Sequence, residues 1–115
     1  MNLTHRPIAQ KGASGISKPM RDNARGQSCT LRLPCCNHDD STTVLAHLRL
    51  FGWAGMGQKP KDFLAVFACS ACHDALDRRD AMTAGIWGCE DVLRALGETQ
   101  IRQHKAGNFP MKGER

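Results

Sequence analysis

Two cysteines of this 115-residue chain, Cys69 and Cys72, are separated by two residues. A CxxC pair places two thiolates on one side of a tight turn, and zinc prefers four such ligands in a tetrahedron. The other two ligands would come from upstream, where Cys29 and one of the neighbours Cys35 and Cys36 are available. The spacing therefore predicts a structural zinc site that joins the N-terminal part of the chain to the segment that follows the CxxC pair.

The six cysteines could have other uses, which depend on the compartment. They could form disulfides, remain as buried free thiols, or attach a c-type haem at the CxxCH sequence that ends in His73. The first twenty residues hold no apolar run longer than Ile8–Ala9, so we expect no signal peptide, no membrane span and a cytoplasmic protein. Cytosolic thiols stay reduced and haem attachment needs export, so metal binding is favoured.

Two histidines have the chemistry that phosphodiester hydrolysis needs. His47 lies in an apolar segment, and His73 directly follows the CxxC pair. A neutral imidazole can take a proton from water near pH 7, and a divalent metal can stabilise the charge that develops on the phosphate. Asp77, one helical turn after His73, is either a second metal ligand or the partner of a neighbouring arginine in a helix salt bridge.

Local patterning predicts the elements that must position these groups. Runs of β-branched and aliphatic residues predict strands, glycine-rich stretches predict loops, and apolar residues at helical spacing predict helices. We expect Ser70 to cap a helix and Cys89 to be a small buried residue at the start of another. In chain order we predict an extended segment over 29–33, a turn over 35–41, a strand over 42–50, a loop over 51–61, a strand over 62–69, a helix over 71–82 and an amphipathic helix over 89–104, whose apolar residues are Val92, Leu93, Leu96 and Ile101.

Length and charge restrict the organisation of the chain. A chain of 115 residues fits one small domain and excludes a barrel or a two-domain enzyme. We expect a flexible basic arm over residues 1–20, a domain over 21–106 and a frayed tail over 107–115. The net charge of +5 lies entirely in residues 1–32, where six basic residues accompany one acidic residue. A basic lead-in to a neutral domain suits a polyanion such as DNA, although it could also be an ordinary solvated segment.

At these residues the sequence resembles the HNH-type (ββα-metal) endonucleases, and most nearly the prophage-encoded YbcO-like nuclease family. The resemblance covers roughly residues 21–104 and rests on four stretches: RDNARGQSC (21–29), VLAHLRL (44–50), GQKPKD (57–62) and LAVFACSACHDALDRR (64–79). It implies an α+β fold, namely a small zinc-stapled ββα-metal (HNH-like) domain with an extra C-terminal helix. It also implies a metal-dependent DNA endonuclease of phage or prophage origin.

The resemblance assigns roles to individual residues. It makes His47 the general base and His73 a ligand of the catalytic metal, which would be Mg²⁺ or another divalent cation. His47 or Asp77 would complete that site, with Asp62 and Asp74 as further candidates. The Cys-Asn pair that precedes VLAH in the family matches Cys36-Asn37. The implied ligands of the structural zinc are therefore Cys29, Cys36, Cys69 and Cys72.

Two departures from the HNH pattern keep a second function open. Many HNH proteins have an aspartate just before the general base, where this chain has Ala46, and the middle asparagine is absent. The alternative function is a zinc-stapled nucleic-acid-binding module without catalysis. In either case the basic residues around the site are candidate phosphate contacts, namely Arg49, Lys59, Lys61, Arg78 and Arg79. A nuclease with one active site cuts one strand, so a homodimer would serve to cut both.

Overall fold

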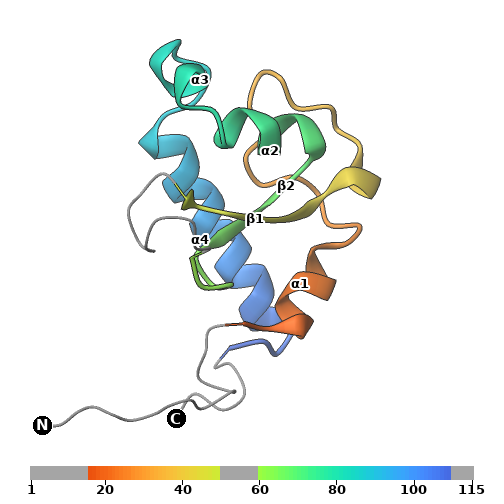
Figure 1. The fold of residues 1–115 in the computed structure, drawn as a ribbon. Helices are drawn as coiled ribbons and strands as arrows, with labels where there is room; N and C mark the ends of the chain where they lie inside the picture. The colour runs from red at the N-terminus through yellow and green to blue at the C-terminus, as the bar shows by residue number, and fades with distance from the viewer. Residues whose placement is uncertain (1–15, 50–59, 110–115) are drawn as a thin grey trace, which may run out of the picture.

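The computed structural model describes residues 16–49 and 60–109, which form a small mixed domain of helices around a two-stranded sheet (Figure 1). The predicted order of strand, strand and helices is present, and each predicted strand forms over a shorter range. No helix within these ranges has the length and apolar character needed to cross a membrane. In chain order the elements are α1 (Lys18–Ala24), the 3₁₀ helix η2 (Asp40–Thr42), β1 (Val44–His47), β2 (Ala65–Ala68), α2 (Ser70–Leu76), α3 (Arg79–Thr83) and α4 (Cys89–Lys105).

The two strands are antiparallel, with Val44 opposite Ala68 and His47 opposite Ala65. Side chains alternate across a strand, so each face of the sheet enters a different apolar cluster. One cluster takes Ala46, Val66 and their neighbours on that face, together with residues of α2 and α4. The other face packs with α1 and holds Leu45, Ala65, Phe67, Met20 and Ala24. His47, two residues after Leu45, lies on the α1 side of the sheet.

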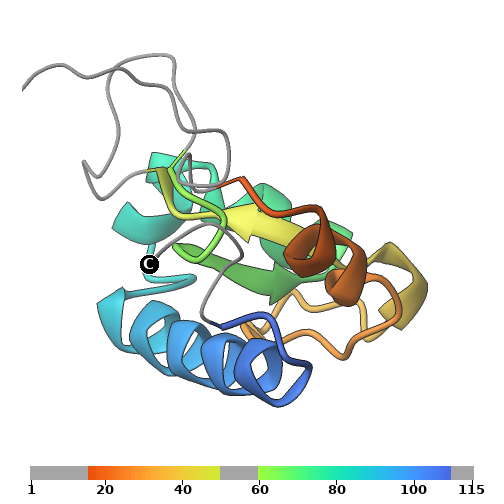
Figure 2. The same cartoon turned by 90° about the horizontal axis from the view of Figure 1, so that it is seen from below.

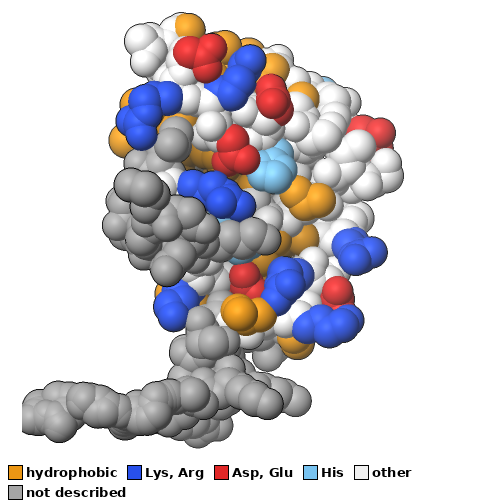
Figure 3. Space-filling model, in the orientation of Figure 1, with side chains coloured by type: hydrophobic (Ala, Val, Ile, Leu, Met, Phe, Trp, Pro, Cys, Tyr) orange, Lys and Arg blue, Asp and Glu red, His pale blue; other side chains and the backbone are white. Residues whose placement is uncertain are grey.

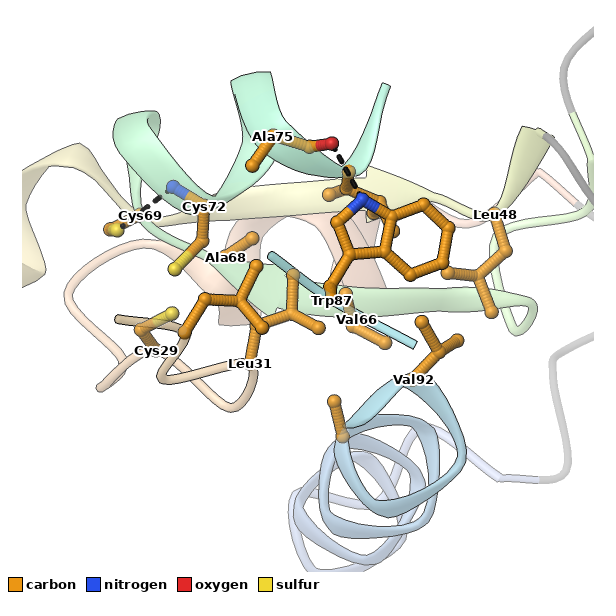
Figure 4. Packing of buried hydrophobic residues seen from close by; sticks show 14 of the residues in the cluster. Cys29, Leu31, Leu48, Val66, Ala68, Cys69, Cys72, Ala75, Trp87 and Val92 are labelled. Atoms are coloured by element: carbon orange, nitrogen blue, oxygen red, sulfur yellow. Dashed lines mark hydrogen bonds between the residues drawn. The ribbon is translucent and has the colours of Figure 1, made fainter. Parts of the chain in front are cut away.

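The first cluster centres on Trp87 (Figure 4). Its buried indole N–H donates a hydrogen bond of 2.7 Å to the backbone carbonyl of Ala75 in the last turn of α2. A continuous helix would offer that carbonyl to the amide of residue 79. The predicted helix over 71–82 is instead two helices, α2 and α3, with Arg78 in an extended conformation between them. The prediction of a single helix was wrong because the contact with Trp87 is not local.

The start of α2 also differs from the prediction. Cys69, not Ser70, is the residue that caps the helix, and its Sγ accepts a hydrogen bond of 3.4 Å from the amide of Cys72. Ser70 is the first helical residue and is exposed. The Cys69 sulfur can therefore accept a hydrogen bond from a free amide in the first turn of α2 while it faces the other cysteines.

Residues 29–33, predicted as an extended segment, follow the outer edge of β2 without becoming a strand. The Thr30 amide donates to the Phe67 carbonyl at 2.7 Å, and the Phe67 amide donates to the hydroxyl of Thr99 on α4 at 3.1 Å. Arg32 then takes a positive φ of 47°, which ends the extended run. The backbone groups of Phe67 at this edge of the sheet are thus hydrogen-bonded by one loop residue, Thr30, and one helix residue, Thr99.

Helix α1 begins at Lys18, inside the stretch that the sequence pattern assigned to an N-terminal arm. Ser17 caps it by accepting a hydrogen bond of 3.2 Å from the Met20 amide, and Pro19 lies in its first turn. Its buried residues, Met20 and Ala24, pack against the sheet. The earlier part of the arm and residues 110–115 lie outside the described residues.

Helix α4 confirms the predicted C-terminal helix, but its buried face is not the predicted one. Val92 is buried and Leu96 is half-buried, whereas Leu93 and Ile101 are exposed to 71% and 57%. Polar residues of α4 face the protein because they satisfy backbone groups there: Thr99 binds Phe67, and the buried Gln103 donates to the Met20 carbonyl at 3.0 Å. Apolar periodicity alone could not identify this face.

Candidate functional site

Four cysteines converge on one point beside the start of α2. The sulfur atoms of Cys29, Cys36, Cys69 and Cys72 all lie within 4.8 Å of one another. A zinc ion with Zn–S bonds of about 2.3 Å would place its thiolates about 3.8 Å apart in a tetrahedron. The Cys69 and Cys36 sulfurs are 3.8 Å apart, and those of Cys29 and Cys72 point toward each other (Figure 4). The four thiols therefore fit a metal ion such as zinc.

Two thiols of this group, Cys29 and Cys72, share a hydrogen bond that shifts their pKa values in opposite directions. A hydrogen bond from Cys72 lowers the pKa of the Cys29 thiol to about 4, although burial acts in the opposite direction. The same hydrogen bond and burial raise the pKa of Cys72, so one sulfur of the pair is favoured as the thiolate, which is the form that binds metals, and the other as the proton donor. Convergence of both CxxC sulfurs on two upstream cysteines also favours a metal over haem attachment.

The remaining two cysteines lie apart from this group. Cys35 is exposed, with its Sγ 3.9 Å from the Ala71 carbonyl, so the choice of Cys36 over Cys35 agrees with the geometry. Cys89 is exposed at the start of α4, and the prediction that it is buried was wrong. Cys89 is at the surface because α4 begins there, and the first residue of the helix to be buried is Val92.

A second constellation lies at the end of β1. The Nε2 atom of His47 is 2.8 Å from Oδ1 of Asp62, and both side chains are less than a tenth exposed. The other carboxylate oxygen of Asp62 accepts hydrogen bonds from the Ser17 amide at 2.6 Å and from Nε of Arg21 at 3.1 Å. Asp62 thus uses both oxygens to hold the imidazole against the start of α1, and it accepts three hydrogen bonds from the protein.

The charge state of Asp62 follows from these contacts. Burial by itself would raise the pKa of its carboxyl, but hydrogen bonds from His47, Ser17 and Arg21 outweigh burial and lower the pKa. The carboxylate is therefore ionised near neutral pH and accepts the N–H of His47 at Nε2. No second hydrogen bond to His47 is formed among the described residues, which leaves Nδ1 with a lone pair available.

This arrangement predicts how acid affects stability. The folded-state pKa of Asp62 is lowered, so its contribution is complete above the ordinary carboxyl pKa of about 4 and is lost as the pH falls further. We expect Asp62→Asn to lower the free energy of unfolding at pH 7 by about 1–3 kcal/mol and to flatten its decline below pH 5. Denaturant titrations at several pH values measure this.

The control for that experiment is Asp74→Asn, because the Asp74 side chain is 70% exposed and pairs with Arg78 at 3.6 Å on the surface. Such a pair contributes little to stability. If both variants lost stability equally at every pH, the buried network around Asp62 would contribute no more to the free energy of unfolding than a surface ion pair.

His73 and Asp77 form a pair on the exposed side of α2. Nε2 of His73 is 3.3 Å from Oδ2 of Asp77, and the two side chains are 38% and 40% exposed. Asp74 pairs with Arg78 instead. Among the described residues no group of three ligand-type side chains includes His73 or Asp77. Two adjacent donors, an imidazole nitrogen and a carboxylate oxygen, nevertheless suit a cation that takes its other ligands from water and a substrate phosphate.

One open pocket brings the two histidines together. It measures about 600 Å³, and its lining includes His47 from β1, His73 from α2 and three arginines, Arg21, Arg25 and Arg49. On the face seen in Figure 3, a histidine side chain is exposed near the position of α2, beside basic and acidic side chains. The pocket therefore combines imidazole groups with a concentration of positive charge, as a phosphate-binding cleft requires.

The predicted phosphate contacts are only partly in this pocket. Arg49 lines it, whereas Lys61, Arg78 and Arg79 are exposed residues outside its lining, and Lys59 lies outside the described residues. Sequence reasoning assigned no site role to Arg21 or Arg25, because it did not predict α1. The serine cap and early proline of Ser17-Lys18-Pro19 are the signal that could have identified this helix.

Comparison with known proteins extends this description. Residues 18–108 match the model of a protein family described as "Putative nuclease YbcO". The chain is 44% identical over 89 residues to "Putative nuclease YbcO" of Escherichia coli (strain K12), a match that covers 76% of this chain and 93% of the relative. The same values hold for "Putative nuclease ybcO" of Enterobacteria phage 82.

A solved structure is similar as well. It is described as "Structure of a putative bacteriophage protein from Escherichia coli str. K-12 substr. MG1655", and it shares 39% sequence identity with this chain at a TM-score of 0.58. The match covers 77% of this chain and 100% of that chain. The compared proteins therefore share the region that contains both the four-cysteine group and the two histidines.

Proposed function

The chain belongs to the YbcO nuclease family, and from that premise we propose that it is a metal-dependent DNA endonuclease of the HNH type. The observation that supports this most is the pocket itself, where His47, held by a buried aspartate, and His73 share one cleft with three arginines. The relative in Enterobacteria phage 82 supports a phage or prophage origin.

In this proposal His47 is the general base. Asp62 accepts the N–H at Nε2, so the neutral tautomer presents the lone pair of Nδ1. Nδ1 takes a proton from a water molecule whose oxygen attacks the phosphorus, and the bond from phosphorus to the 3′ oxygen breaks. Asp62 keeps the ring in one orientation and stabilises the imidazolium that forms. We therefore assign Asp62 to positioning His47 rather than to holding a metal.

The arginines of the pocket bind the DNA backbone in this proposal. Arg25 and Arg49 lie in the lining, and Arg21 reaches both the pocket and Asp62. Guanidinium groups donate several hydrogen bonds in a fixed fork, which matches phosphate oxygens. These contacts are independent of base sequence, so the geometry supports backbone recognition.

His73 and Asp77 are the residues that would hold the catalytic divalent cation. Such an ion, when bound, stabilises the negative charge on the scissile phosphate and on the leaving oxygen. The 3.3 Å between the two donors is compatible with both contacting one ion. His47 contributes no bond through Nε2, because Asp62 occupies that atom.

A plasmid-nicking assay tests the proposal. Supercoiled plasmid is incubated with the zinc-loaded protein, with Mg²⁺ or Mn²⁺ added or left out, because a strong chelator would also attack the cysteine group. We expect nicking only with the added cation, and a loss of roughly a hundredfold or more in the His73→Ala variant. His104→Ala, at the exposed end of α4, is the matched control and should cut normally.

The alternative is a nucleic-acid-binding module without catalysis. Its support is that His73 and Asp77 offer two ligands where a preformed metal site would offer more. It predicts DNA binding that weakens steeply with salt and no cleavage with any divalent cation. Binding without nicking by the wild-type protein would therefore replace the nuclease with this function.

A further inference from the structure

Helix α4 exposes two large apolar side chains to solvent. Leu93 is 71% exposed and Ile101 is 57% exposed, while the opposite side of the helix, with Val92, Ala95 and Thr99, is buried. Figure 2 shows α4 along one side of the molecule, with the sheet on its inner side and no other described element on its outer side. Exposed apolar side chains at helical spacing mark a surface that can bind a partner.

The pattern of this face is symmetric about Gly97. At 100° and 1.5 Å per residue, Leu93 and Ile101 lie about 40° to either side of Gly97 and about 6 Å before and after it along the axis. Glu90 and His104 lie about 20° from the same line, about 10 Å on either side. A twofold axis through Gly97 therefore places Leu93 of one copy beside Ile101 of the other.

The charges of the helix favour an antiparallel arrangement. Glu90 and Asp91 are in its first turn, and Arg102, His104 and Lys105 are in its last. An antiparallel copy brings each acidic end against a basic end, whereas a parallel copy would juxtapose like charges. Glu90 then lies opposite His104 and next to Lys105 of the second copy.

The described part of the chain does not require glycine at position 97. A Cβ atom at this position would meet no atom within 4 Å, so packing inside the chain does not require glycine there. Glycine in a helix interior lowers helix stability relative to alanine. A glycine at the centre of the exposed face instead allows a second helix to approach closely.

From these observations we propose that the outer face of α4 pairs with the same face of a second copy, forming an antiparallel homodimer. The interface would have Leu93 and Ile101 at its core, Gly97 on the twofold axis, and Glu90 paired with the basic C-terminal turn. No α4 residue lines the pocket that holds His47 and His73, so pairing leaves both pockets open. The inference does not depend on the proposed nuclease activity.

Sedimentation velocity over a range of concentrations tests this interface. We expect the full chain to show a concentration-dependent dimer and Leu93→Glu or Ile101→Glu to weaken association at least tenfold. Met82→Glu, at an exposed apolar residue of α3, is the matched control and should dimerise normally. A wild-type chain that remains monomeric at 100 micromolar, or a dimer that persists in Leu93→Glu, would overturn the proposal.

Two further variants test the register. Glu90→Lys should weaken the dimer, and adding Lys105→Glu should restore it, because the swap re-establishes opposite charges. Gly97→Cys, made with Cys35→Ser and Cys89→Ser to remove the exposed thiols, should form a disulfide-linked dimer under mild oxidation, since residue 97 meets its own copy. Equal cross-linking of Met82→Cys in the same background would contradict the antiparallel arrangement centred on Gly97.

Discussion

The Cys69→Ser variant is expected to lose its zinc and to unfold. The wild-type chain should carry about one zinc ion, and the variant close to none. Cys69 contributes one of the four converging sulfurs and also caps α2 through the amide of Cys72. Its loss therefore removes a ligand and frees the first turn of the helix that carries His73.

The size of this effect follows from what zinc contributes to small domains. Structural zinc sites in finger peptides supply about 10–16 kcal/mol, which is comparable to the whole stability of a typical domain at about 5–15 kcal/mol. Here the ligands span Cys29 to Cys72 and connect the loop after α1, the turn before β1 and the start of α2. Aromatic residues make up only 5% of the chain, so the core has few large side chains to compensate.

Metal analysis of the purified protein measures the zinc content, and far-ultraviolet circular dichroism measures whether the variant is folded. The matched controls are Cys35→Ser and Cys89→Ser, because both residues are exposed and lie outside the sulfur group. Both controls should keep full zinc content and a folded spectrum. Retention of zinc by Cys69→Ser would contradict the four-cysteine site, and loss of zinc without unfolding would contradict the stabilising role.

The His47→Ala variant is expected to lose DNA cleavage by about 10²–10⁴-fold under conditions where the wild-type protein nicks plasmid, which is the usual contribution of a general base. His47 is the only histidine of the pocket lining whose imidazole is fixed by a buried carboxylate among the described residues. Zinc content should not change, because His47 is not part of the cysteine group.

The Asp62→Asn variant tests whether Asp62 positions the general base, His47. The amide can still accept from Nε2 through its oxygen, but its NH₂ group then faces the Ser17 amide and Arg21, which are donors themselves. We expect cleavage to fall by an intermediate amount, roughly 10- to 100-fold, with a changed dependence on pH because the neighbouring charge that stabilises the imidazolium is removed.

His104→Ala is the matched control for both site variants, since His104 is exposed at the end of α4 and belongs neither to the pocket lining nor to the cysteine group. It should cleave at the wild-type rate. Unchanged cleavage in His47→Ala, with normal folding, would remove His47 from the role of general base while leaving the nuclease proposal to be judged by the wild-type assay.

Local patterns were sufficient to predict several parts of this protein. The two strands and the C-terminal helix follow from periodicity and composition over short windows, whereas most of the predicted loop over 51–61 lies outside the described residues. The CxxC spacing indicated a metal site, and the resemblance to a family selected Cys36 rather than Cys35, in agreement with the sulfur positions. The length of these segments, their flanking turn residues and their residue types were enough to separate strand from helix here.

Other parts depended on contacts between residues far apart in the chain. The Trp87 indole donates to the Ala75 carbonyl where α2 ends, and hydrogen bonds of Thr99 and Gln103 turn the polar side of α4 inward, leaving Leu93 and Ile101 outside. Neither effect has a signature in a local window, because each requires knowing which distant backbone group needs a partner.

The sequence by itself determined which residues could do chemistry: four thiols for one metal, and two histidines on a strand and at a helix start. Only the tertiary structure decided how they are used. It placed Asp62 against His47, 15 residues away, and brought Arg21 and Arg25 of α1 to the same pocket. The physical reason is that residue type sets proton affinity and ligand preference, whereas orientation, burial and electrostatic surroundings arise only when separate elements pack together.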